Sequence, residues 1–252
     1  MPSLVRGVSD EEHGRESERV SQLRIDYSDL RRALARARAV PQREIALRGA
    51  RVLAFWAALT MLPFVLLIRG GMLAYRGWGL GTWLSLALAA LATASLVAAY
   101  ARWASRRLGA GHAARRLAAR AAFGVALAYV AYMLVFVASA NVKSDDVRAE
   151  YRSTHPLLRV ASSALILADP ASMVTDAGRT PQDYRRMGLT PAEASLHFVQ
   201  ADGYVHALDL RTEGRSELRN RAIQLAFWML GFHTLRHVGT ADHLHVSLGI
   251  PR

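Results

Sequence analysis

The stretch VLAFWAALTMLPFVLLI, residues 52–68, contains no charged side chain and is bracketed by Arg51 and Arg69. Two further uncharged runs follow at residues 77–101 and 121–142. Each run approaches or exceeds the roughly 20 residues that a helix needs to cross a bilayer. Buried helices of a soluble protein are the alternative, but three such runs would need a much larger protein around them. The sequence therefore predicts three transmembrane helices in contact with a lipid bilayer.

The distribution of arginine sets the expected orientation of these helices. Seven arginines lie within residues 31–51 and six within residues 102–120, but only two lie within residues 69–78. Because basic residues favour the cytoplasmic side, the N-terminus is expected inside the cell. Everything after residue 142 is then extracytoplasmic. A composition rich in alanine and arginine, with Lys143 as the only lysine, indicates a GC-rich bacterial genome. The predicted spans are therefore expected in a bacterial inner membrane.

Three regions follow from this pattern: a cytoplasmic helical region at 1–49, the membrane region at 50–142 and an extracytoplasmic domain at 143–252. Apolar residues at helical spacing predict a juxtamembrane helix over 9–40. No cleavable signal peptide is expected, because the first fifty residues are polar. Small residues in the second and third spans favour close helix packing and a possible homo-oligomer. No span has an interior Asp, Glu, Lys or His, which favours an anchor over a transporter.

The net charge of +12 does not predict a nucleic-acid partner. Most of the excess lies beside the apolar runs, where basic residues report topology. Residues 141–252 carry 13 basic and 12 acidic side chains and are nearly neutral. Nucleic acid is therefore excluded from the expected partners.

The C-terminal region alternates between helical and strand patterns. Helices are predicted over 148–167 and 217–231, and the polar segment 178–194 is predicted to be a loop. The predicted strands are 173–175, 196–199, 204–210, 233–238 and 244–248. This order predicts an α+β domain with a small antiparallel sheet.

Histidines cluster in the last sixty residues. The six are His197, His206, His233, His237, His243 and His245. The chain has no cysteine, so a metal would have to be held by His, Asp or Glu. Imidazole and carboxylate together suit zinc, so the composition alone leaves open either a Zn²⁺ site or histidines with a structural role.

Strand alternation narrows the choice of ligands. Along residues 204–210, alternate side chains share a face. His206 and Asp209 then point to opposite faces, so they are poorly placed to share one ion. His243 and His245 do share a face. A neighbouring strand with His197 could bring a third group near Asp209.

Three motifs resemble one family. They are SLHFVQADGYVHALDLRT at 195–212, LGFHTLRHV at 230–238 and ADHLHVSL at 241–248, with VTDAGRTP at 174–181 upstream. The order is similar to the zinc domain of bacterial D-Ala-D-Ala carboxypeptidases, murein endopeptidases and the hedgehog signalling domain. The resemblance covers about residues 146–252 and implies a hedgehog/D-Ala-D-Ala peptidase-like fold.

Matched residue by residue, the resemblance implies His197, Asp209 and His245 as the zinc ligands. His243 would lie beside the metal, near the reacting group. Arg179 falls where peptidases of this family place an arginine that contacts the substrate carboxylate.

Two departures from the family pattern stand out. Asp209 lies twelve positions after His197, a wider spacing than the family has, which implies an insertion around residues 200–204. If the insertion changes the register, His206 could replace His197 as a ligand.

The second departure concerns the general base. The carboxypeptidases use a Glu just before the last strand, but this chain has no Glu after Glu217. His237 or Asp242 is the nearest substitute, and a histidine suits the role because its pKa is near neutrality.

These features predict a membrane-anchored zinc metallopeptidase that hydrolyses amide bonds of peptidoglycan peptides. One alternative is a non-catalytic zinc-dependent binding module of the same fold, which the absent Glu favours. The other is a scaffold for a membrane complex, in which the histidines are structural.

Overall fold

The computed structural model describes two compact units, residues 1–58 and residues 59–252, and each is treated by itself. Nearly all of the helix predicted over 9–40 lies outside the described residues. The described residues are 27–28, 31–32, 42–186, 188, 190, 194–239 and 242–249.

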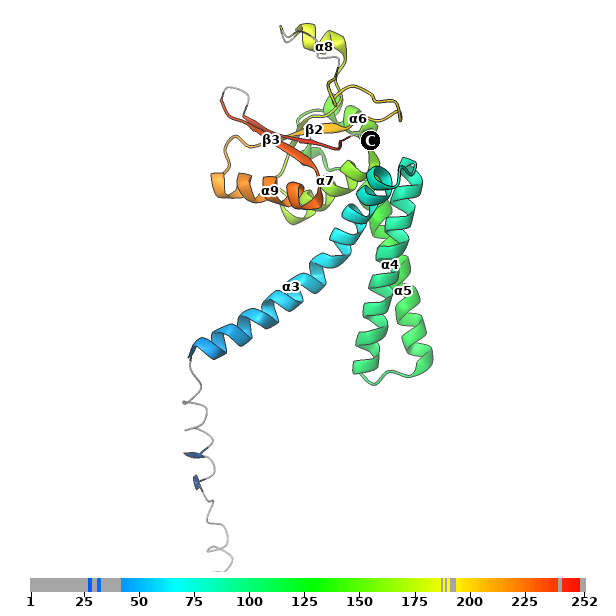
Figure 1. Ribbon diagram of the computed structural model, residues 1–252, viewed down its shortest axis with the longest axis vertical. Helices are drawn as coiled ribbons and strands as arrows, with labels where there is room; N and C mark the ends of the chain where they lie inside the picture. Colours follow the sequence, from blue (N-terminus) through cyan, green and yellow to red (C-terminus); the bar gives the residue numbers. More distant parts are fainter. Residues whose placement is uncertain are drawn as a thin grey trace, which may run out of the picture. The chain divides into compact units, whose positions relative to one another are not determined.

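Three helices are long and apolar enough to cross a membrane, as judged by length and composition. They are α3 (Gln42–Met72), α4 (Thr82–Arg107) and α5 (His112–Val135). A five-residue π turn, η1 (Leu73–Gly77), follows α3. Figure 1 shows α4 and α5 side by side and antiparallel. The prediction of three long apolar helices followed by a small sheet domain is confirmed, and it indicates a membrane protein.

The third span differs from its predicted limits of 121–142. The helix begins at His112 and ends at Val135, before the uncharged run is over. Asn141 is buried and donates hydrogen bonds to the carbonyl oxygens of Pro170 and Ser172. The prediction was wrong here because hydropathy does not separate lipid-facing residues from residues of a protein core.

The helix predicted over 148–167 is two helices, α6 (Asp145–Ser153) and α7 (Pro156–Ala168). Pro156 disfavours helical backbone at the residue before it and has no N–H to continue a helix. His155 therefore caps α7, and its ring accepts a hydrogen bond from the backbone N–H of Leu157.

Four antiparallel strands form one sheet in the order β1-β2-β4-β3. They are β1 (Val174–Asp176), β2 (Ala207–Arg211), β3 (His233–His237) and β4 (His243–Ser247). Asp209 of β2 pairs with His245 of β4, and His243 of β4 pairs with His237 of β3.

Two predictions between β1 and β2 were wrong. The predicted loop 178–194 contains the short helix α8 (Pro181–Arg186). The predicted strand 196–199 is a series of turns with one bridge, between Val199 and Val205. Gln200 stabilises these turns by donating its side-chain amide to the carbonyl oxygens of Ser195 and Phe198.

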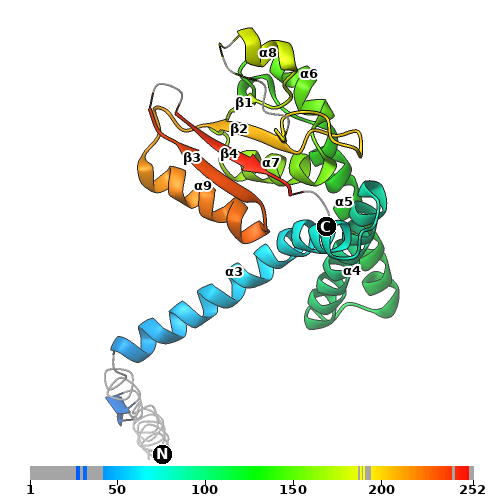
Figure 2. The same ribbon diagram turned by 45° about the horizontal axis from the view of Figure 1, so that its top comes forward.

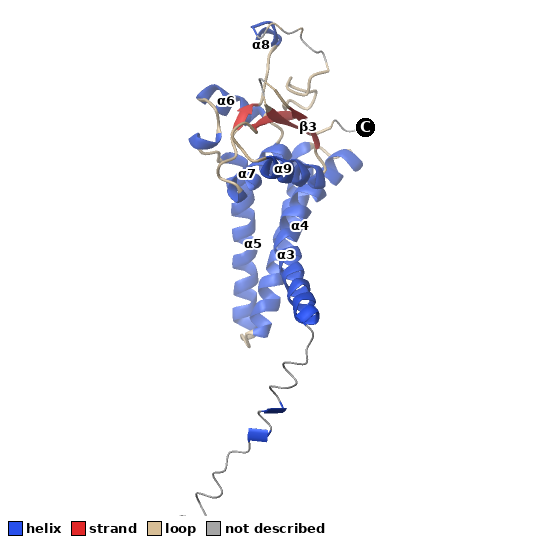
Figure 3. Cartoon of the chain, turned by 90° about the vertical axis from the view of Figure 1, so that its left-hand side faces the viewer, coloured by secondary structure: helices blue, strands red, loops and turns tan. Residues whose placement is uncertain are grey.

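The two faces of the sheet differ in chemistry. Helices α7 and α9 (Glu217–Leu230) lie on one face (Figure 2), where Leu208, Leu210, Leu244 and Val246 are buried. Helix α8 lies beyond the other side of the sheet (Figure 3), and residues 209, 243 and 245 belong to that other face. Strand alternation therefore places the polar groups away from the apolar core.

The apolar core is continuous from the membrane helices into the sheet domain. It includes Ile68 of α3, Met133 of α5 and Leu157 of α7, all almost inaccessible to solvent. Gly71 of α3 lies directly against Leu157, because a Cβ on Gly71 would lie 2.5 Å from its Cδ2. This close approach positions α7 against the end of α3. It also positions His155, which caps the start of α7.

Candidate metal centre

Three side chains that the sequence singled out meet on the polar face of the sheet. His197 comes from the turns before β2, Asp209 from β2 and His245 from β4. The Nε2 of His197 lies 3.2 Å from the Nδ1 of His245 and 3.4 Å from the Oδ1 of Asp209. The Nδ1 of His245 lies 3.0 Å from the same Oδ1. The three residues form a group that could hold a metal ion.

The triangle of donor atoms has the size that a tetrahedral ion requires. With metal–ligand distances of about 2.0–2.2 Å, neighbouring ligand atoms of a tetrahedral site lie about 3.3–3.6 Å apart. The observed sides of 3.0, 3.2 and 3.4 Å are close to this range. A single small cation above the triangle could therefore contact all three atoms with little movement.

The protonation of His197 also suits a ligand. Its Nδ1 lies 2.6 Å from the carbonyl oxygen of Ala177. A carbonyl only accepts, so Nδ1 carries the proton and Nε2 points its lone pair into the triangle. Metal-binding histidines commonly use their second nitrogen in this way, which fixes the ring and its tautomer.

Asp209 is held as a carboxylate. Burial alone raises the pKa of Asp209, but the neighbouring imidazoles of His197, His245 and His243 outweigh burial and hold the pKa well below its usual value. One oxygen, Oδ1, faces the triangle, and Oδ2 accepts a hydrogen bond of 2.9 Å from Arg179. The ligand atom is thus ionised at neutral pH.

The guanidinium group of Arg179 binds two carboxylates. It bonds Asp209 and, at 2.7 Å, the Oδ2 of Asp176. Here it orients a candidate ligand, and the contact with a substrate carboxylate that the resemblance implies stays a prediction.

His243 and His237 lie next to the triangle. The Nε2 of His243 is 3.7 Å from the Oδ2 of Asp209. The rings of His237 and His243 are stacked, with centroids 4.5 Å apart. Asp242, the other predicted base, accepts hydrogen bonds from Thr212 and Arg236. Of the two predicted bases, His237 is the one that stacks on His243, the histidine next to Asp209.

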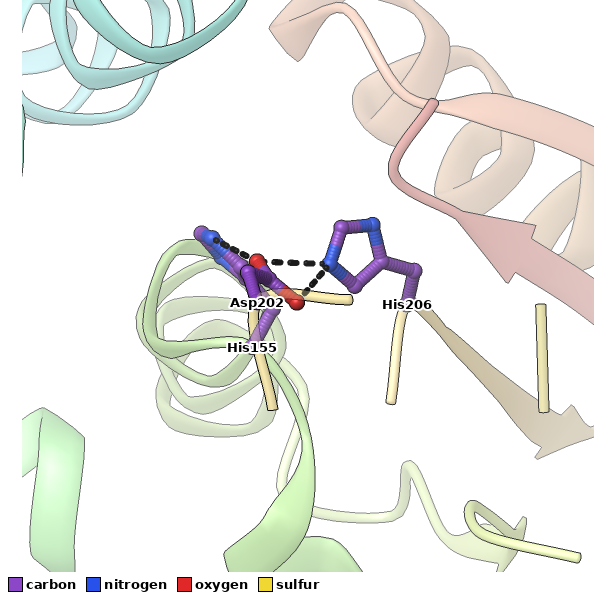
Figure 4. A group of neighbouring side chains, drawn as sticks. All are labelled: His155, Asp202 and His206. Atoms are coloured by element: carbon purple, nitrogen blue, oxygen red, sulfur yellow. Dashed lines mark hydrogen bonds and ion pairs between the residues drawn. The ribbon is translucent and has the colours of Figure 1, made fainter. Parts of the chain in front are cut away.

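A second group, which the sequence did not single out, consists of His155, Asp202 and His206. Figure 4 shows the two rings directed toward the carboxylate of Asp202. The Nε2 of His206 lies 3.0 Å from the Oδ2 of Asp202, and the Nε2 of His155 lies 3.7 Å from it. His206 therefore belongs to this group and lies apart from Asp209 and His245.

Hydrogen bonding distinguishes this second group from the first. The Nδ1 of His155 accepts the Leu157 N–H, so the neutral ring carries its proton on Nε2, the atom that faces Asp202. That nitrogen is a donor and has no lone pair for a metal. We therefore interpret the second group as a hydrogen-bonded network.

Asp202 connects the sheet domain to the end of the membrane helices. It accepts hydrogen bonds from Tyr75 of η1 at 2.8 Å and Thr82 of α4 at 3.4 Å. Asp202 lies in the segment 200–204, where the resemblance to the zinc peptidase family implied an insertion. No local pattern links positions 75, 82, 155 and 202, so sequence reasoning missed the network. The sequence feature that could have indicated this network was Asp202, an acidic residue within the implied insertion.

Comparisons of the chain with protein-family models, with curated proteins and with solved structures found no match. The small antiparallel sheet and the His/Asp group are compatible with the zinc peptidase family but do not identify it. The fold and the site define a broader class: a membrane protein whose sheet domain has a buried His/Asp group that could hold a metal ion.

The network at Asp202 predicts a loss of stability in acid. Burial, followed by the charge of His206, lowers the pKa of His155 to about 3, against an ordinary value of 6.5. Below pH 6.5 the unfolded chain binds a proton that the folded chain excludes. Folding stability should therefore fall by about 1.4 kcal/mol per pH unit as the pH drops toward about 3.

This dependence can be measured as the thermal midpoint of the full-length chain in detergent. Asparagine can still cap α7 but cannot titrate, so His155→Asn should flatten the acid slope. His112→Asn, at an exposed histidine, should leave the slope unchanged. Identical slopes for the chain and His155→Asn would contradict the assignment of His155.

Proposed function

We propose that the chain is a membrane-anchored zinc peptidase that hydrolyses amide bonds of peptidoglycan peptides on the outer side of a bacterial inner membrane. One observation supports it most: the convergence of His197, Asp209 and His245 on one point, with His197 in the tautomer that a ligand needs. The motif resemblance supplies the substrate class, and the arginine distribution supplies the orientation.

Each residue of the candidate metal centre has a proposed role. His197, Asp209 and His245 would hold the ion, and Arg179 would fix the carboxylate of Asp209. These three residues would leave room for a water beside a bound zinc ion, and the ion would supply Lewis-acid activation of that water and of a carbonyl. His243, stacked on His237, would orient the reacting group beside Asp209.

His237 is the proposed general base. Burial and the neighbouring His243 lower its pKa, so its ring is neutral at neutral pH and has a lone pair that can accept a proton. Its exposed position at the end of edge strand β3 leaves room for a substrate. The chain's lack of a Glu after Glu217 leaves this role to a histidine.

His237→Ala is expected to lower kcat on muropeptides by about 10²–10⁴-fold, the usual contribution of a general base, with the zinc content unchanged. The assay is chromatography of the products formed by the zinc-loaded, full-length chain in detergent. His233→Ala, on the same strand, is the matched control and should keep full activity.

A second candidate function is a zinc-dependent binding module without turnover, which the absent Glu favours. One zinc ion per chain, binding of muropeptides and no cleavage of any of them would reject the peptidase and support this module.

For the peptidase, unchanged hydrolysis by His237→Ala would reject His237 as the general base.

A further inference from the structure

A groove of about 580 Å³ runs along the last turns of α3 and the π turn η1. Leu62, Val65, Leu66 and Leu73 form its apolar wall, and Arg69 and Arg76 lie along the same side. Positions 62, 65, 66, 69, 73 and 76 recur at three- and four-residue spacing, so they lie on one face of the helix. That face changes from apolar to cationic toward the sheet domain.

The two arginines pack on glycines of the sheet domain. A Cβ on Gly231 would lie 2.5 Å from the Nη1 of Arg69, and a Cβ on Gly249 would lie 3.0 Å from the Nη2 of Arg76. Gly231 ends α9 with a φ of 98°, a conformation that favours glycine. The domain thus leaves space for both guanidinium groups at the groove.

Neither arginine is neutralised within the part of the chain that the structure describes. No hydrogen bond or ion pair to Arg69 or Arg76 occurs among those residues. Arg69 is exposed and also lines an adjoining cavity of about 560 Å³, together with Trp228 and His233. Two positive charges at one end of an apolar groove are complementary to an anion that has an apolar tail.

The groove lies where lipid headgroups would be. Arg69 is the first charged residue after the uncharged run 52–68, so the hydrocarbon region would end near it. Trp78, Trp83 and Trp228 are each more than half exposed around this end of the helices. Tryptophan is enriched at the membrane–water interface, which supports this level.

We propose that this groove binds one phospholipid with an anionic headgroup. Its acyl chain lies along Leu62, Val65, Leu66 and Leu73, and its phosphate lies between Arg69 and Arg76. The π turn supports the site: it directs Tyr75 to Asp202 while Leu73 and Arg76 face the groove. Lipid binding here requires no metal at the sheet and no hydrolysis.

The test uses the full-length chain in phosphatidylcholine nanodiscs titrated with phosphatidylglycerol, with bound lipid counted by native mass spectrometry. The double variant Arg69→Gln/Arg76→Gln should bind phosphatidylglycerol about 30-fold more weakly, because each substitution removes one charge-assisted contact with the bound phosphate. Arg102→Gln/Arg106→Gln removes the same charge at the other end of α4 and should change binding less than about twofold.

Leu73→Trp fills the groove without removing charge and should also release the lipid, which separates occupancy from loss of folding. Equal losses in both arginine doubles would show general charge attraction and overturn the proposal. Competition by inorganic phosphate alone would show a site for a soluble anion and would overturn it as well.

Discussion

His245→Ala should lower the zinc affinity of the full-length chain by on the order of 100-fold or more and abolish metal-dependent hydrolysis. The Nδ1 of His245 lies 3.0 Å from Asp209 and 3.2 Å from His197, so it is one corner of the donor triangle. Loss of a residue that merely orients a ligand costs about 10–100-fold in affinity, and loss of the ligand itself should cost at least as much. Zinc affinity can be measured by competition with a chelating dye.

His233→Ala is the matched control for this variant. His233 lies on β3, in the same sheet, but belongs to neither His/Asp group. It should bind zinc as the unsubstituted chain does. Equal zinc affinities for His245→Ala and the unsubstituted chain would reject the assignment of the ligands.

Leu157→Ala should lower the free energy of unfolding by about 2–5 kcal/mol, the usual cost of removing a buried leucine side chain. Leu157 is fully buried, and its Cδ2 packs on Gly71 of α3 where the sheet domain meets the membrane helices. The cavity would open inside the shared core, and α7 carries His155 at its start. Chemical unfolding of the full-length chain in detergent measures this change.

Leu167 of the same helix provides the comparison. It is 45% exposed, so Leu167→Ala should change the free energy of unfolding by less than about 1 kcal/mol. Similar losses for the two variants would show that the junction between α7 and α3 is not the packed core described above.

The membrane helices were predictable because uncharged length is a local property of the sequence. The ends of these helices were harder to predict. Gly111 precedes α5, and arginines of its first turns lie within the helix although they were assigned to the connection. Long arginine side chains can reach polar surroundings from inside a helix end. At the other end, Asn141 joins the protein core through long-range hydrogen bonds that no local pattern reveals.

The candidate site was predictable to the extent that it follows strand alternation. Alternation separates His206 from Asp209, and the structure places these residues in different groups. The break between α6 and α7 could have been predicted from Pro156 alone. The network of Tyr75, Thr82 and Asp202 could not, because it depends on how the membrane helices dock on a turn more than a hundred residues later in the chain.

The most direct measurement is X-ray absorption at the zinc edge of the full-length chain, with the metal content determined on the same sample. One zinc ion per chain is expected, with two imidazoles and one carboxylate at about 2.0–2.2 Å. A chain that binds no zinc would contradict the account. So would a zinc shell that is the same in His197→Ala or His245→Ala as in the unsubstituted chain.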